Sequence, residues 1–108
     1  MKVELPPIIK KYIEASNQHD VKSILACFSD DAVIRDEEEM LRGNEAIEDW
    51  IVRTIEKYKF QFKPLSIKEE KPEVVVAIEI SGAFPGSTVT PDYRFTTEKD
   101  KILVLAVE

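Results

Sequence analysis

Three stretches in the first half of the chain carry apolar residues at helical spacing. In the first stretch the apolar positions are Leu5, Ile8, Ile9, Tyr12 and Ile13. Pro6 and Pro7 fit its first turn, where a backbone N–H would have no intrahelical partner. The second stretch begins after Asp20, whose carboxylate can cap it, and ends near residues 29–30. The pattern therefore predicts two amphipathic helices before residue 31.

The third helical stretch is the longest. Its apolar stripe covers about three turns of helix and consists of Ile47, Trp50, Ile51, Thr54, Ile55 and Tyr58. Asn44 stands before this stripe, and asparagine is a favoured N-cap residue. We therefore expect a third helix that is capped by Asn44.

The other segments alternate apolar and polar residues with the period of two that is typical of β-strands. A short strand is predicted over residues 32–36, and the acidic run Glu37-Glu38-Glu39 is expected to leave the sheet. Further strands follow residue 59, where a slip in the alternation at Pro64 indicates a bulge or bend. Turns are predicted at Lys71-Pro72, at residues 98–101, and at residues 84–87, where Pro and Gly are placed as in a type II turn.

Helices at the beginning and long adjacent strands afterwards predict one α+β domain over residues 1–108, with the helices on one face of an antiparallel sheet. The strands over residues 74–80 and 102–107 are apolar on both faces, whereas a single layer of helices covers only one of them. Because soluble proteins avoid large exposed apolar surfaces, we expect a homodimer formed through the other sheet face.

The composition is that of an ordinary soluble globular protein, with 44% hydrophobic and 33% charged residues. The net charge of −6 makes nucleic acids and anionic membranes poor partners, because an acidic surface repels phosphate groups. The apolar runs are too short to span a bilayer, and the first residues lack the apolar region of a signal peptide, so a cytoplasmic location is expected. Cys27 is the single cysteine, which excludes an internal disulfide.

The chain resembles the opening of the nuclear-transport-factor-2-like (NTF2-like) superfamily in the order of Tyr12, His19-Asp20, Phe28, Asp30-Asp31-Ala32 and Gly43 to Ile47. Within that superfamily it is similar to SnoaL-like polyketide cyclases and ketosteroid isomerases, and its F-P-G-S and Y-R-F segments fit the SnoaL-like branch. The resemblance implies a cone-shaped, cystatin-like roll. In such a roll three N-terminal helices pack on a curved, mostly antiparallel sheet and enclose a ligand pocket.

The resemblance also implies two catalytic residues, Tyr12 and Asp36. In ketosteroid isomerases a tyrosine of the first helix donates a hydrogen bond to the developing enolate oxygen, and an aspartate that closes the first strand moves the proton. Asp36 matches the second position when counted from Asp31-Ala32, and Tyr12 matches the first when counted back from Asp20. The alternative is that Tyr12 is a core residue and Asp36 a solvated strand end, which is the commoner role of such residues.

A second carboxylic acid of the isomerases has no matching residue here. Those enzymes carry D-x-x-R-F, whereas this chain has P-D-Y-R-F, so Asp92 is one position closer to Arg94. In a strand, a shift of one position places a side chain on the opposite face. We therefore expect Pro91 to face the pocket in place of Asp92, and we do not expect genuine ketosteroid isomerase activity.

Aromatic residues on inward faces are candidates for the lining of the pocket, and they are Trp50, Phe28, Phe62, Phe84, Tyr93 and Phe95. Trp50 and Tyr93 also carry a polar atom that a ligand could use. No cofactor or metal is expected. His19 is the single histidine and lies in a polar break between helices, and consecutive residues of the acidic run point in different directions.

These observations favour a pocket for a small, mostly apolar molecule. If the chain is a catalyst, the expected reaction is proton transfer next to a carbonyl, as in an isomerisation or an aldol-type cyclisation. Two alternatives remain open: a domain that binds a small molecule without turnover, and an adaptor that binds another protein through its sheet. A catalyst needs Asp36 enclosed near Tyr12, whereas a binding domain tolerates Asp36 in solvent.

Overall fold

The structure is a computed structural model, and it describes residues 4–36 and 39–108. Its helices are α1 (Pro7–Asn17), α2 (Val21–Leu25) and α3 (Asn44–Tyr58). Its strands are β1 (Phe28–Asp36), β2 (Glu39–Arg42), β3 (Gln61–Glu70), β4 (Glu73–Ser81), β5 (Asp92–Glu98) and β6 (Lys101–Val107). None of the helices in the described part of the chain is long and apolar enough to cross a membrane.

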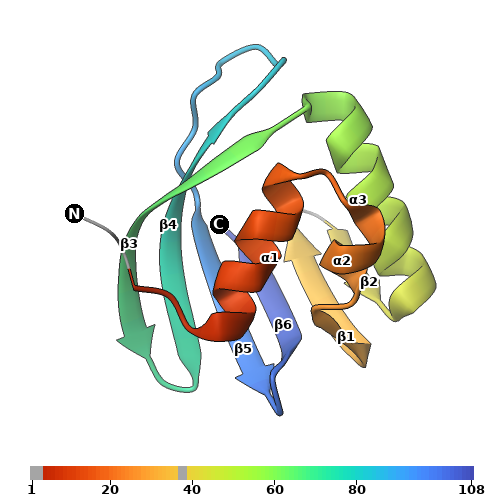
Figure 1. The fold of residues 1–108 in the computed structure, drawn as a ribbon, viewed down its shortest axis with the longest axis vertical. Helices are drawn as coiled ribbons and strands as arrows, with labels where there is room; N and C mark the ends of the chain where they lie inside the picture. Colours follow the sequence, from red (N-terminus) through yellow and green to blue (C-terminus); the bar gives the residue numbers. More distant parts are fainter. Residues whose placement is uncertain (1–3, 37–38) are drawn as a thin grey trace.

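The strands form one sheet in the order β2-β1-β6-β5-β4-β3. β1 and β6 are parallel, and every other neighbouring pair is antiparallel. The sheet is curved, and the helices lie on its concave side (Figure 1). A shift in the β3–β4 register between Pro64 and Ser66 confirms the expected bulge. The α+β class and the mostly antiparallel, curved sheet are therefore confirmed.

The core lies between the helices and the concave face of the sheet. α1 contributes Ile9 and Ile13, and α3 contributes Ile47 and Ile51. The sheet contributes fully buried side chains that alternate with outward-facing ones, among them Ile34, Val76, Ile78, Phe95 and Leu105. The apolar face of each helix and the inward face of the strands therefore pack against each other and form one apolar layer.

Of the two predicted N-cap residues, Asp20 is confirmed and Asn44 is wrong. The Asp20 side chain accepts a hydrogen bond from the Ser23 backbone N–H at 3.2 Å and caps α2, as predicted. Asn44, in contrast, is the first residue of α3 and not its cap. The N-cap position belongs to Gly43, whose φ of +88° suits a residue without a side chain. The Asn44 amide instead donates to Asp30 Oδ1 at 3.4 Å.

The first strand and the acidic run also differ from the prediction. β1 begins at Phe28, four residues earlier than expected, because Phe28 pairs with Ile102 of β6. Glu39 does not leave the sheet, since it begins β2 and pairs with Asp36. Glu37 and Glu38 lie outside the described residues. β2 is short and largely exposed, so it has no apolar alternation from which it could be predicted.

The loop between β4 and β5 extends beyond the sheet, beside the C-terminal end of α3 (Figure 1). Its predicted type II turn is confirmed by a hydrogen bond from Ser87 N to Phe84 O at 3.3 Å and by a φ of +82° at Gly86. The Ala83 N–H donates to the Tyr58 carbonyl oxygen at 2.8 Å. These contacts hold the loop beside the concave face of the sheet.

Candidate functional site

A cavity of about 790 Å³ lies inside the roll. It is bordered by α1, by one side of α3, by the concave face of the sheet and by the β4–β5 loop. Most of its lining is aromatic or aliphatic, and its polar side chains are Ser16, Asp36, Glu39, Thr54, Lys57, Thr90 and Glu108. This volume lies within the range of pockets that hold small molecules, whose walls combine apolar side chains with polar groups that orient the ligand.

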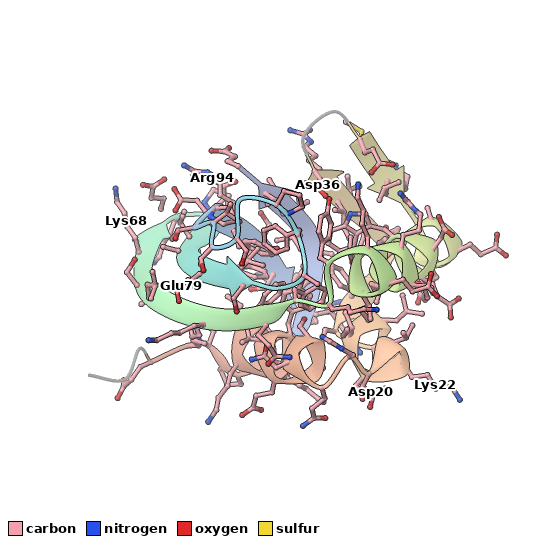
Figure 2. The ribbon with its side chains drawn as sticks, turned by 90° about the horizontal axis from the view of Figure 1, so that it is seen from above. Asp20, Lys22, Asp36, Lys68, Glu79 and Arg94 are labelled. Atoms are coloured by element: carbon pink, nitrogen blue, oxygen red, sulfur yellow. The ribbon has the colours of Figure 1, made fainter. Side chains whose placement is uncertain are left out.

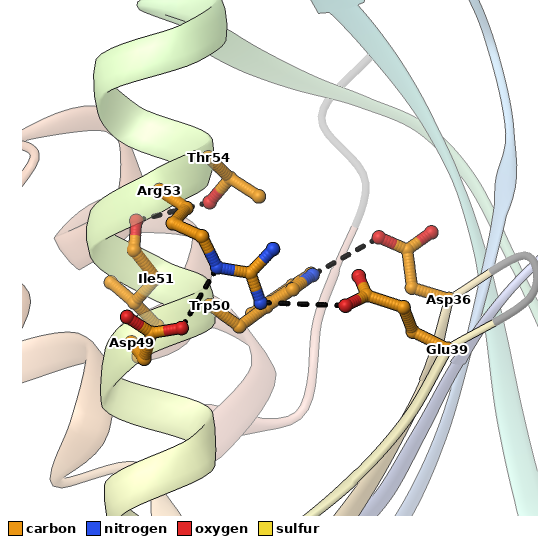
Figure 3. Close-up of polar contacts among 7 residues, drawn as sticks. All are labelled: Asp36, Glu39, Asp49, Trp50, Ile51, Arg53 and Thr54. Atoms are coloured by element: carbon orange, nitrogen blue, oxygen red, sulfur yellow. Dashed lines mark hydrogen bonds and ion pairs between the residues drawn. The ribbon is translucent and has the colours of Figure 1, made fainter.

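Asp36 stands at the end of β1, where that strand lies beside β2 and β6. Its Oδ2 atom accepts a hydrogen bond of 3.0 Å from the indole N–H of Trp50 on α3 (Figure 3). The contact is partly buried, and both residues line the cavity. Trp50 thereby fixes one carboxylate oxygen, while Oδ1 has no hydrogen-bond donor among the described residues. A carboxylate held in this way keeps one oxygen available to a ligand.

Tyr12 lines the same cavity from α1 and is only 2% exposed. Its ring packs edge-on against Phe28 and Phe95, with centroid distances of 5.8 and 5.6 Å. Burial raises the pKa of the Tyr12 phenol far above the ordinary value, and the negative charge of Asp36 adds to this effect. The phenol is therefore neutral at physiological pH and can donate a hydrogen bond.

Tyr93 of β5 is a second buried phenol in the lining. Its pKa is also raised well above the ordinary value, mainly by burial and further by the nearby Tyr12 and Asp36. Both tyrosine rings contact Phe62, at centroid distances of 6.4 Å for Tyr12 and 5.6 Å for Tyr93. The cavity thus brings together one carboxylate and two neutral phenols.

Four of the six aromatic residues that were predicted to line the cavity do so. Trp50, Phe62, Phe84 and Tyr93 border the cavity. Phe28 and Phe95 do not, because they pack behind the Tyr12 ring, in the core. Alternation identifies the inward face of a strand, but that face includes both the core and the cavity wall, so it cannot separate the two sets. Sequence reasoning also missed lining residues at the junction of α3 and β3, which are Lys57, Tyr58 and Phe60.

Asp92 is exposed and does not belong to the lining, whereas Pro91 and Tyr93 on either side of it do. The backbone of Asp92 pairs with Glu108 through hydrogen bonds of 3.1 and 3.0 Å. This arrangement agrees with the face expected from P-D-Y-R-F. The second carboxylic acid of the isomerases therefore has no counterpart at Asp92 in this cavity.

Two of the three lining carboxylates form ion pairs with arginines that also bind other carboxylates. Glu39 lies 3.5 Å from the Arg53 guanidinium (Figure 3), and Glu108 lies 3.2 Å from that of Arg94. Figure 2 shows Arg94 on the outer side of the curved sheet, while Asp36 lies beside the α3 side of the roll. Asp36 forms no ion pair with any described residue. It is the carboxylate of the lining whose charge is left uncompensated.

The remaining candidates lie outside the cavity. His19 Nε2 is 2.7 Å from the Phe60 carbonyl oxygen, which can only accept, so this nitrogen carries the proton. The bond joins the α1–α2 loop to the residue before β3. Cys27 is 1% exposed, and burial raises the pKa of its thiol. The described residues contain no group of three His, Cys, Asp or Glu side chains that could hold a metal ion. His19 and Cys27 therefore serve the packing of the fold.

Among solved structures, the chain is similar to a protein of Sinorhizobium meliloti that is provisionally described as a polyketide cyclase. The two share 32% sequence identity over 96% of this chain and 95% of the other, with a TM-score of 0.91. An NTF2-like protein of unknown function from Cytophaga hutchinsonii shares 20% identity over 100% of this chain and 93% of the other, with a TM-score of 0.78. No protein with a curated description matches the chain.

A protein with a ketosteroid isomerase-like fold from Catenulispora acidiphila, solved in complex with trimethylamine, has the same architecture. It is 15% identical over 97% of this chain and 86% of the other, with a TM-score of 0.83. At this identity the likeness shows the fold alone. The SnoaL-like domain family matches residues 9–103, which is most of the chain. The chain therefore belongs to the SnoaL-like domain family and has an NTF2-like fold.

Proposed function

We propose that the cavity binds a small, mostly apolar carbonyl compound and moves a proton at the carbon next to the carbonyl. The observation that carries this proposal is the placement of Asp36, Tyr12 and Tyr93 in one cavity. The description of the Sinorhizobium meliloti relative as a polyketide cyclase supports the same class of chemistry.

Asp36 acts as the base in the proposed reaction. Its free Oδ1 takes a proton from the carbon next to the carbonyl, and the electron pair of the broken C–H bond forms an enolate. The Trp50 N–H holds Oδ2 at 3.0 Å, so the carboxylate does not have to be oriented when the substrate arrives. Asp36 then returns the proton to another carbon in an isomerisation. In a cyclisation the enolate carbon attacks a second carbonyl, whose π electrons move to its oxygen, and Asp36 gives its proton to the alkoxide that forms.

Tyr12 donates a hydrogen bond to the enolate oxygen in this proposal. A neutral phenol with a strongly raised pKa keeps its proton and stabilises the developing negative charge. Tyr93 is placed in the same lining and can supply a second neutral donor. Two phenols then take the role that the isomerases divide between a tyrosine and a protonated carboxylic acid.

The exchange of α-protons for deuterium tests this proposal without knowledge of the natural substrate. We expect the protein in D₂O to accelerate the loss of the α-proton NMR signals of 2-tetralone, a bicyclic neutral ketone. Asp36→Asn should abolish the acceleration because an amide does not accept the proton, and Tyr12→Phe should lower it about 10²-fold or more. Exchange no faster than in buffer, or unchanged in Asp36→Asn, would contradict the proposal.

Binding without turnover is the second candidate, and the exposed position of Asp92 favours it. Without a carboxylic acid at that position the cavity has one oxyanion donor of the isomerase pair and relies on Tyr93 for the other. Saturable binding of 2-tetralone with no α-proton exchange would identify this alternative. The same cavity would then serve recognition or storage of an apolar molecule.

A further inference from the structure

The charges that line the cavity are unevenly compensated. Glu39 and Glu108 are paired with arginines, at 3.5 and 3.2 Å. Lys57 is the one cation of the described lining, and it forms no ion pair with the described residues. Asp36 and Lys57 are therefore the two charged side chains of the described lining that have no ion-pair partner among the described residues.

These two charges lie at different ends of the same helix face. Asp36 is hydrogen-bonded to Trp50, and Lys57 follows Trp50 by seven residues on α3. With a helical rise of 1.5 Å per residue, the Cα atoms of Trp50 and Lys57 are separated by about 10 Å along the helix axis. Lys57 is exposed, and its ammonium lies 5.2 Å from the centroid of the Tyr58 ring, which also borders the cavity. The positive charge therefore stands at the opening.

We propose, building on the function proposed above, that the ligand is an elongated carbonyl compound with a carboxylate group at its far end. Its carboxylate binds Lys57, and its reacting carbonyl lies beside Asp36, which is bonded to Trp50 two helical turns before Lys57. The apolar body between them lies against aromatic rings of the lining, among them Phe62 of β3 and Phe84 of the β4–β5 loop.

The arrangement also fixes the direction in which the ligand enters. A carboxylate at the Asp36 end would face a like charge in a partly buried position, which is unfavourable, whereas at the Lys57 end it gains an ion pair. A protonated amine would favour the reverse direction, with its cation at Asp36. The sign of the ligand charge that the cavity prefers therefore distinguishes the two arrangements.

Intrinsic fluorescence of Trp50 provides the binding measurement, because Trp50 is the single tryptophan and lines the cavity. Three probes of equal shape are compared: 3-(4-acetylphenyl)propanoate, its uncharged amide, and the corresponding primary amine. They are titrated into the wild-type protein, Lys57→Gln, and Lys10→Gln. Lys10 lies exposed on α1 and outside the lining, so its substitution removes the same charge without touching the cavity.

We expect the acid to bind several-fold more tightly than the amide, on the order of five-fold, as for a partly exposed ion pair. The preference should persist in Lys10→Gln, disappear in Lys57→Gln and weaken at high salt. The affinity of the amide should be the same in all three proteins, which shows that Lys57→Gln leaves the cavity intact.

Equal binding of acid and amide to the wild-type protein would overturn the proposed ligand class. An acid preference that survives in Lys57→Gln would overturn it too, and so would tighter binding of the amine than of the acid. In each of these outcomes binding is observed, so the proposed function stands. Absence of any fluorescence change with all three probes would count against both proposals. The α-proton exchange of the uncharged 2-tetralone tests the proposed function separately.

Discussion

At the scale of single residues, Asp36 at the end of β1 and Tyr12 on α1 come from separate elements and line one cavity. The bond between Asp36 and Trp50 could not be predicted, because it depends on how α3 crosses the end of β1. Phe28 and Phe95 were assigned to the lining but pack behind Tyr12. A residue pattern shows which face of a helix or strand a side chain lies on. Whether that side chain lies in the core or at the cavity depends on how the elements pack together.

The buried phenols predict a dependence of stability on alkaline pH. The folded-state pKa of Tyr12 lies above its unfolded value of about 10, so its contribution to stability is complete below that pH and is lost as the pH rises further. We expect the free energy of unfolding to fall more steeply above pH ~10 in the wild-type protein than in Tyr12→Phe, by up to about 1.4 kcal/mol per pH unit.

Urea unfolding of the two proteins at a series of pH values measures this difference. Phenylalanine keeps the ring that packs against Phe28 and Phe95, so the comparison isolates the hydroxyl group. The lysines titrate in both proteins and cancel in the comparison. Parallel pH profiles would contradict the assignment of Tyr12 as a phenol that is held neutral by burial.

At the scale of elements, helical periodicity predicted α1, α2 and α3 well, because each helix has a continuous apolar face. The exposed edge strand β2 gave no such signal, and its pairing with β1 depends on tertiary contacts. The bulge at Pro64 was predictable because it shifts the apolar alternation. The N-cap at Gly43 was not, because a favourable cap residue stands directly beside it.

The close contact between the residues after β4 and the end of α3 leads to a prediction at the scale of elements. A Cβ atom at Gly82 would collide with the carbonyl oxygen of Tyr58, which also accepts the Ala83 N–H. We expect Gly82→Ala to lower the free energy of unfolding by about 1–3 kcal/mol, since backbone must move to make room. Thermal unfolding measures the loss, at about 4–8 °C for each kcal/mol.

Ser81→Ala is the matched control for this substitution, because Ser81 is exposed and adjacent. It should change the melting temperature little. Equal melting temperatures for Gly82→Ala and the control would show that the β4–β5 loop is not held against α3 as described.

At the scale of the whole molecule, the outer face of the sheet carries apolar side chains that the helices do not cover. Val33, Val104 and Ala106 are half-buried and alternate with core residues of β1 and β6. Arg94 lies on the same face and binds Glu70 and Glu73 at 3.0 and 3.2 Å. We propose that two copies of the chain pack through this face, since such a surface favours association.

Sedimentation at micromolar protein concentration is expected to show a dimer. Val104→Arg should shift it to a monomer, because a charge would be placed in the centre of the proposed interface. Gln18→Arg introduces the same charge at an exposed position beside α1 and should leave the dimer intact. A wild-type monomer would contradict the proposed interface, and so would a Val104→Arg variant that remains dimeric.

The binding of a carbonyl compound beside Asp36 is the central claim, and the indole N–H of Trp50 reports on it directly. This N–H is bonded to Asp36 at 3.0 Å, and because the chain has one tryptophan it gives a single indole peak in a ¹H–¹⁵N NMR spectrum. Titration with 2-tetralone should shift this peak progressively to a saturating value. The backbone peaks of Tyr93 and Thr54 should shift with it, while exposed Lys10 should not change. An indole peak that stays in place at saturating ketone would contradict the assignment of this cavity as the ligand site.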